Sequence, residues 1–81
     1  MILLQGLFSI YVDFEGNGEK SELIVNPLEE HFNIISEGGV IASLKNLDKG
    51  VWEQIEGNLD QKQVALITDS IDNRYTYLHK N

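Results

Sequence analysis

Hydrophobic and polar residues alternate along residues 7–26 in the pattern of a β-hairpin. The alternating apolar positions are Phe8, Ile10, Val12, Phe14, Leu23 and Val25. Strict period-two alternation is typical of strands with one buried face. Asn17-Gly18 lies between the two runs, and Asn-Gly is the favoured pair in a two-residue type I′ turn. The sequence therefore predicts that the chain opens with two antiparallel strands.

A turn at Asn17-Gly18 also predicts the register of this hairpin, because it gives every strand position one opposite partner. The predicted cross-strand pairs are Glu15 with Lys20, Asp13 with Glu22, Val12 with Leu23, Tyr11 with Ile24 and Ile10 with Val25. The aliphatic pairs of Val12 and Ile10 would build the buried face. Pro27 is expected to end the second strand.

A second hairpin is predicted from residues 32–44. Its apolar positions alternate on both sides of Glu37-Gly38-Gly39. A three-residue loop that ends in a left-handed glycine keeps these positions on one face. This loop pairs Phe32 with Leu44, Ile34 with Ala42 and Ser36 with Val40.

The same type of loop is expected at Asp48-Lys49-Gly50. It would pair Leu47 with Val51 and Lys45 with Glu53. Trp52 would then lie on the face that carries Leu44, and Gly57-Asn58 would end the strand.

The last segment changes to helical periodicity. Its apolar positions recur at spacings of three and four, and they are Val64, Ile67, Ile71, Tyr75 and Leu78. Asp60 is a favourable N-cap and Gln63 completes a capping box, while Leu59 and Val64 are placed to form a hydrophobic staple. We therefore expect a helix over residues 61–76. A competing interpretation takes residues 64–68 and 75–77 as two further strands.

These elements predict an α+β fold, an antiparallel β-meander of four to five strands with one C-terminal helix packed on one face. The helix is expected on the apolar face because a sheet needs a second layer to bury that face. Residues 1–81 are expected to form a single domain with a thin core, since a chain of this size buries only about 60% of its unfolded surface. The absence of cysteine excludes disulfides and thiolate metal sites and favours a cytoplasmic protein.

The chain carries a net charge of −7 and has a pI near 4.5. This excess of carboxylates argues against direct binding to nucleic acid or to anionic membranes, because both attract Lys and Arg. It permits a basic partner. Residues 1–7 are apolar but lack a basic segment, since the first lysine is Lys20, so we expect no signal peptide. No segment approaches the ~18 apolar residues of a membrane span.

The region around Asp13 carries the strongest candidates for chemistry, and each has a simpler structural interpretation. Asp13, Glu15 and Asn17 resemble the start of a calcium loop, but Ile24 stands where the bidentate Glu of such a loop is needed. Asp13 with Glu22 would be a carboxylate pair, but on the solvent face of a sheet such a pair is screened. We predict no metal, cofactor or catalytic site here.

The remaining candidate residues also favour structural roles. His31 and His79 are the only histidines, and they lack the spacing of a zinc motif. Trp52 and the pair Tyr75 and Tyr77 are of the residue types that dominate binding hot spots. For Trp52 we expect core packing beneath the helix.

Four apolar residues are predicted on the outer face of the sheet, away from the helix. They are Tyr11 opposite Ile24 and Ile35 opposite Ile41, with Asp13, Glu15 and Glu22 as an acidic rim. An apolar strip with a polar rim marks an interaction surface. We therefore expect a non-catalytic interaction module that binds a protein partner or forms a homodimer.

Two other functions have distinct structural requirements. An acidic inhibitor that mimics nucleic acid would carry its carboxylates on one ridge, and its binding would weaken steeply with salt. The ridge would consist of Asp13, Glu15, Glu19, Glu22, Glu29 and Glu30. A small enzyme would need a concave site with converging polar groups, and the sequence shows no such constellation.

The C-terminal half resembles certain small uncharacterised bacterial proteins. In those proteins a strand with a tryptophan leads through a short polar turn into a terminal helix. The similar segments here are Trp52–Leu59, the helix that carries Ile67 and Ile71, and the preceding strand Val40–Leu44. The resemblance implies the meander-plus-helix fold and implies no activity or site residue.

Overall fold

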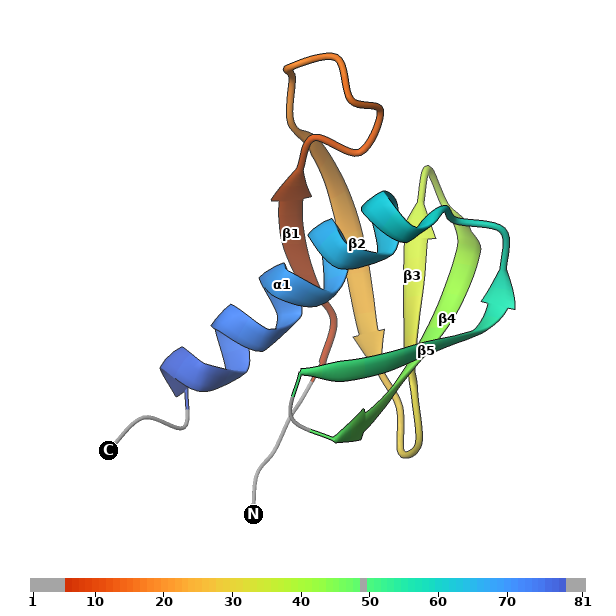
Figure 1. The fold of residues 1–81 in the computed structure, drawn as a ribbon, viewed down its shortest axis with the longest axis vertical. Helices are drawn as coiled ribbons and strands as arrows, with labels where there is room; N and C mark the ends of the chain where they lie inside the picture. The colour runs from red at the N-terminus through yellow and green to blue at the C-terminus, as the bar shows by residue number, and fades with distance from the viewer. Residues whose placement is uncertain (1–5, 49, 79–81) are drawn as a thin grey trace.

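Five antiparallel strands form one sheet in the order in which they occur along the chain, and a C-terminal helix packs across it (Figure 1). The computed structural model describes residues 6–48 and 50–78, and their side chains as far as Tyr75. The elements are β1 (Phe8–Val12), β2 (Ser21–Pro27), β3 (Phe32–Ser36), β4 (Gly39–Asp48), β5 (Val51–Gly57) and α1 (Gln61–Leu78). The predicted α+β meander is confirmed, and the alternative of two C-terminal strands is wrong.

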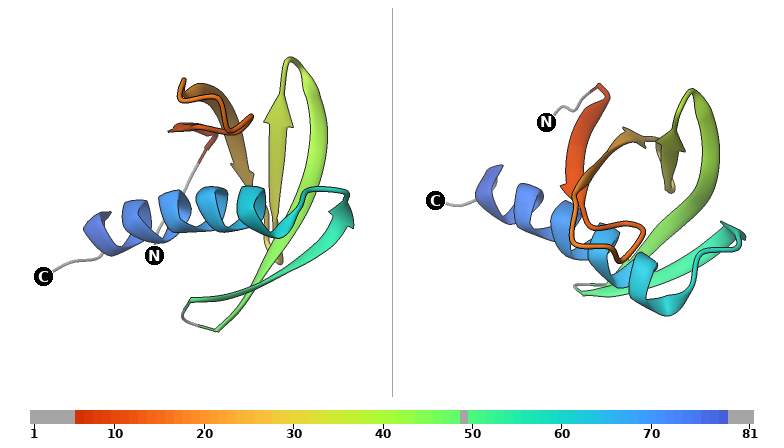
Figure 2. Two further views of the ribbon diagram at one scale, coloured as in Figure 1. Left: turned by 45° about the horizontal axis from the view of Figure 1, so that its top comes forward. Right: turned by 90° about the horizontal axis from the view of Figure 1, so that it is seen from above.

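The sheet curls, and α1 lies across the opening between the two edge strands β1 and β5 (Figure 2). The inner face and the helix stripe share one buried cluster, which consists of Ile10, Val12, Leu23, Val25, Ile34, Ala42, Leu44, Ile67 and Ile71. Ile67 and Ile71 come from the predicted helical stripe, while the side chain of Leu78 lies outside the described residues. Within the described residues, no helix has the length and apolar character needed to cross a membrane.

The register of the first hairpin differs from the prediction by two residues. The observed pairs are Phe8 with Val25, Ser9 with Ile24, Ile10 with Leu23, Tyr11 with Glu22 and Val12 with Ser21. The strands are joined by an eight-residue loop, residues 13–20, in place of a two-residue turn. The Asp13 carboxylate orders this loop by accepting the backbone N–H groups of Asn17 and Gly18, each at 3.0 Å. A shift of two residues keeps every side chain on its predicted face.

The second hairpin has the predicted register at its open end and a different one at its turn. Phe32 lies opposite Leu44 and Ile34 opposite Ala42, as expected, but Ser36 lies opposite Gly39. Glu37 and Gly38 both have positive φ, 53° and 86°, which is the signature of a two-residue type I′ turn. A β-bulge beyond Ile34 absorbs the one-residue difference.

The third hairpin, formed by β4 and β5, also has the predicted register away from its turn and a register shifted by one residue next to the turn. Lys45 lies opposite Glu53 as expected, but Val51 lies opposite Asp48, and the predicted pair of Val51 with Leu47 is wrong. The Asn46 side chain closes this turn by donating to the backbone oxygens of Asp48, at 2.8 Å, and Val51, at 3.1 Å. Lys49 of the predicted loop lies outside the described residues.

The start of α1 is the one the sequence predicted. The Asp60 N–H donates to Gln63 Oε1 at 3.1 Å, and the Gln63 N–H donates to Asp60 Oδ1 at 2.8 Å, which completes the capping box. Leu59 and Val64 both pack against the buried cluster. Gln63 Nε2 also donates to the Phe14 carbonyl at 3.1 Å, which ties the helix start to the loop after β1.

Candidate binding surfaces

The outer face of the sheet carries a row of aliphatic side chains in register across three strands. Ile24 on β2 lies opposite Ile35 on β3, and Ile35 lies opposite Val40 on β4. Successive side chains of a strand point to opposite faces, and the neighbours Leu23, Val25 and Ile34 are fully buried beneath α1. Ile24 and Ile35 therefore face outward. The Val40 side chain is 57% exposed.

This row differs from the predicted strip in two respects: Val40 takes the place of Ile41, and Tyr11 does not lie opposite Ile24. Tyr11 is on the outer face and 59% exposed, but it lies opposite Glu22, so it meets Ile24 only as a diagonal neighbour. Ile41 has no direct partner on β3, because the bulge places Val40 opposite Ile35, and Ile41 packs against the buried cluster. We define the outer row as Tyr11, Ile24, Ile35 and Val40.

The predicted acidic rim is only partly in place. Glu22 borders the outer row, and its Oε2 accepts a 2.6 Å hydrogen bond from the Ser9 hydroxyl and a 3.5 Å bond from the Tyr11 hydroxyl. Asp13 holds the loop after β1 through its two backbone contacts. Glu15 is exposed in that same loop, beyond the end of β1. Glu22 is therefore the rim residue closest to the row.

The acidic residues of the predicted ridge separate into two groups at opposite ends of the sheet (Figure 1). One group belongs to β2 and the loop before it, and consists of Asp13, Glu15, Glu19 and Glu22. The other group, Glu29 and Glu30, follows β2. The last five residues of β2, Leu23 to Pro27, lie between Glu22 and the second group, a span of about 17 Å. No single ridge joins the two groups.

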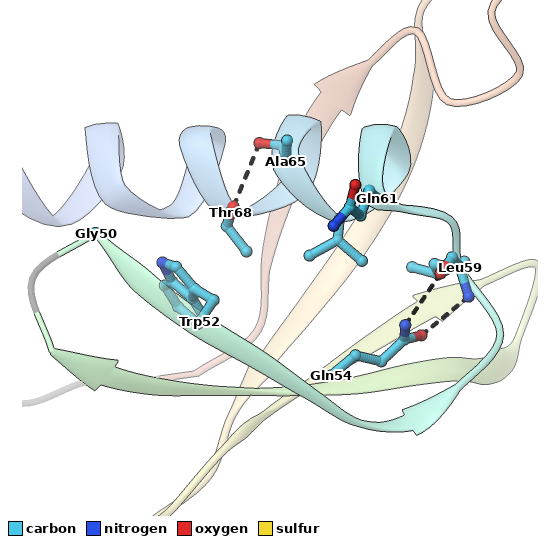
Figure 3. Close-up of a pocket in the computed structure, with 8 residues that line it drawn as sticks. Gly50, Trp52, Gln54, Leu59, Gln61, Ala65 and Thr68 are labelled. Atoms are coloured by element: carbon cyan, nitrogen blue, oxygen red, sulfur yellow. Dashed lines mark hydrogen bonds between the residues drawn. The ribbon is translucent and has the colours of Figure 1, made fainter.

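A hollow of about 520 Å³ lies between β5 and the first half of α1 (Figure 3). It is lined by Gly50, Trp52, Gln54, Leu59, Gln61, Val64, Ala65 and Thr68. The Gln54 side-chain amide is engaged at both its oxygen and its nitrogen by the backbone of Leu59, accepting its N–H at 2.9 Å and donating to its carbonyl at 3.0 Å. The Thr68 hydroxyl donates to the Ala65 carbonyl at 3.3 Å. These two polar side chains serve the local structure.

Trp52 separates this hollow from a second one of about 370 Å³, which lies toward the other end of α1. The Trp52 indole packs against the Phe32 ring, with 5.3 Å between the ring centroids, and its Nε1 donates to Asp72 Oδ2 at 3.2 Å. Trp52 also contacts the buried cluster, so its predicted core role is confirmed. Trp52 therefore lines both hollows as well as packing against the core.

A third hollow of about 450 Å³ lies between β1 and the second half of α1, with Ser9, Tyr11, Ser70, Asn73 and Arg74 among its lining residues. The Arg74 guanidinium stacks over the Phe8 ring, 4.1 Å from its centroid, as a cation–π contact.

The neighbouring Tyr75 packs edge-on against Phe8 and Phe32, with ring centroids 6.0 Å and 5.9 Å away. Burial raises the pKa of the Tyr75 hydroxyl, and the Arg74 charge offsets part of that shift. The side chain of Tyr77 lies outside the described residues.

The residues considered for chemistry do not come together. Asp13 and Glu22 are not opposite each other, because Glu22 pairs with Tyr11. The backbone carbonyl of His31 accepts the Leu28 N–H at 2.8 Å, while His79 lies outside the described residues. In the part of the chain that the structure describes, no group of three or more His, Asp or Glu side chains is placed to hold a metal ion.

Comparison with known proteins identifies no relative of this chain. No protein-family model, no curated protein and no solved structure matches it. The resemblance to small uncharacterised bacterial proteins therefore stays a prediction.

Proposed function

We propose that this protein is a non-catalytic interaction module that binds a partner protein through the outer row. The observation that carries the proposal is the alignment of Ile24, Ile35 and Val40 in one register across three strands. Side chains in register form a continuous apolar surface, and such a surface on the solvent face of a small domain is typical of an interface.

Charge favours a different protein over a second copy of this chain. Each copy carries a net charge of −7, and Glu22 borders the row, so face-to-face pairing of two rows would bring like charges together. A partner with an apolar centre and basic residues around it would meet the row with complementary charge. Association would then be faster at low salt.

The proposal is tested by capture from the native lysate with a matched pair of variants. Val40→Lys places a charge in the row, while Leu47→Lys places the same charge at a position of similar exposure, 54% against 57%, on β4 outside the row. Nuclease treatment removes proteins bridged by nucleic acid. We expect Val40→Lys to lose a partner that wild type and Leu47→Lys retain, with a loss in affinity of about tenfold or more.

The contrary result is equally clear. A Val40→Lys variant that captures the same proteins as wild type would contradict the outer row as the binding surface. A dimer of the isolated protein in sedimentation equilibrium, dissociated by Val40→Lys, would replace the partner with a second copy.

The nucleic-acid mimic is not favoured by a specific observation. Its carboxylates fall into two groups separated by most of the length of β2. A basic nucleic-acid-binding protein that is captured only at low salt, and is captured equally by Val40→Lys, would support the mimic in place of the outer row.

A further inference from the structure

β5 is an edge strand whose free side faces α1. Among the described residues, the sheet order places β4 on one side of β5 and no strand on the other. A three-residue connection turns the chain from β5 into α1, and the hollow described above is bounded by β5 on one side and α1 on the other (Figure 3). An edge strand presents a row of backbone N–H and C=O groups that can pair with another chain.

The hollow beside this edge suits an apolar side chain. Leu59, Val64 and Ala65 line it together with the Trp52 indole. The polar side chains of Gln54 and Thr68 are engaged by nearby backbone groups, as described above. The volume of about 520 Å³ falls within the usual range of ligand pockets, about 300–1,000 Å³. Backbone groups at the edge and an apolar hollow next to them are the two components of peptide recognition by strand addition.

The charges around the groove favour a basic occupant. The acidic residues on β5, at the helix N-cap and on the helix are Glu53, Glu56, Asp60, Asp69 and Asp72. The basic residues described in the same region are Lys45, opposite Glu53, and Lys62 and Arg74 on α1, and Arg74 is turned toward β1, where it stacks over the Phe8 ring. Acidic side chains on an edge repel a second copy of the same edge, which makes self-pairing of β5 unfavourable.

We propose that the groove between β5 and α1 binds an extended segment of a basic partner protein. The segment pairs with β5 as a sixth strand and places one apolar side chain in the hollow against Trp52. Pairing is expected over Val51–Gln54, because a bulge at Ile55 interrupts the regular strand beyond it. This surface is separate from the outer row and does not depend on it.

The test is a selection from a random library of displayed twelve-residue peptides. Peptides are kept if they bind wild type and not Ala65→Arg, a variant that places a cationic side chain over the hollow at an exposed helix position. Asn73→Arg is the matched control, since it makes a similar change in charge at an exposed position outside this hollow. Trp52 is the only tryptophan of the chain, so its fluorescence reports binding directly.

We expect selected peptides rich in Lys or Arg around an apolar residue. They should bind Ala65→Arg about tenfold more weakly than wild type, or worse, and Asn73→Arg as tightly as wild type. Two peptides are made for each sequence, one methylated at the odd-numbered and one at the even-numbered backbone nitrogens. Only one of these two sets of N–H groups can pair with β5, so methylation of that set should abolish binding and methylation of the other should not.

Three results would overturn the proposal. The first is a selection that yields no peptide distinguishing wild type from Ala65→Arg. The second is binding that survives methylation of either set of alternate backbone nitrogens. The third is binding that perturbs the amides of Ile24 and Ile35 in place of those of β5.

Discussion

Replacing Gly57 with alanine is predicted to destabilise the fold strongly. A Cβ atom at this position would lie 2.7 Å from the Ile41 carbonyl oxygen, 2.8 Å from Ala42 Cβ and 2.9 Å from Ala42 Cα. These atoms belong to the backbone and to the shortest side chain of the facing strand, so none can rotate away. Gly57 also has a φ of 112°, a conformation that residues with a Cβ rarely adopt. Steric overlap and backbone strain therefore act together.

The two contributions can be estimated separately. A strained φ costs about 1–3 kcal/mol, and overpacking at a close contact costs about another 1–3 kcal/mol. We expect Gly57→Ala to lower the free energy of unfolding by about 2–6 kcal/mol. A domain of 81 residues has a total of about 4–12 kcal/mol, so the variant could be partly unfolded at 25 °C.

Urea unfolding followed by Trp52 fluorescence measures this change against two controls. Gly16 also has a positive φ, 76°, but a Cβ added there would have nothing within 4 Å. Gly16→Ala should therefore show the backbone strain alone, a loss of about 1–2 kcal/mol. Gly39→Ala has neither strain nor a close neighbour and should change stability by less than about 0.5 kcal/mol. A Gly57→Ala variant no less stable than Gly16→Ala would refute the close approach of β5 to β4 at this point.

Three further predictions concern the first loop, the helix start and Tyr75. Gly18→Val should lower the free energy of unfolding by about 1 kcal/mol or more, because Gly18 has a φ of 88° that a β-branched residue resists; equal stability in urea would contradict that conformation. Asp60→Ala should lower the free energy of unfolding by about 1 kcal/mol in the same assay, because it removes the N-cap acceptor. Asp60→Asn keeps a side-chain oxygen at this position and should keep most of the wild-type stability; equal losses in the two variants would refute the capping role. The pKa of Tyr75 is raised by burial above its usual 10.0, so its contribution to stability is complete below pH 10 and is lost as pH rises through the folded-state pKa. Tyr75→Phe should therefore lose less stability than wild type between pH 9 and pH 11, and an identical alkaline decline would contradict this assignment.

The fold class could be predicted from the sequence because its signals tolerate small errors in register. The first hairpin is shifted by two residues, and since the side-chain period is two, Ile10 and Leu23 still face the core. The helix start was predictable because Asp60 and Gln63 are only three residues apart in the chain and hydrogen-bond to each other directly. Local and global preferences agree at these positions.

The turns could not be predicted because side chains and strained residues decide them. Asp13 binds two backbone N–H groups and stabilises a long loop where Asn17-Gly18 suggested a short turn. Glu37 adopts positive φ although it is not glycine, which shortens the second turn by one residue. The hydrophobic pattern contains neither of these preferences.

The predicted outer strip was wrong where its register depends on the second turn. One bulge places Val40 opposite Ile35 and removes Ile41 from the predicted strip. The groove beside β5 arises from the placement of α1 across the open side of the sheet, which involves residues distant in sequence. In the sequence, only Trp52, a residue type common in binding sites, pointed to this groove. Packing of Trp52 in the core explained the same residue equally well.

The most direct test of the account is chemical-shift mapping of the labelled protein as the captured partner is added. Binding through the outer row predicts that the largest changes fall on the amides of Tyr11, Ile24, Ile35 and Val40. Changes confined to β5 and α1 would assign the partner to the groove, and changes confined to the loop after β1 would favour an acidic mimic. Either of those results would contradict the outer row as the principal binding surface.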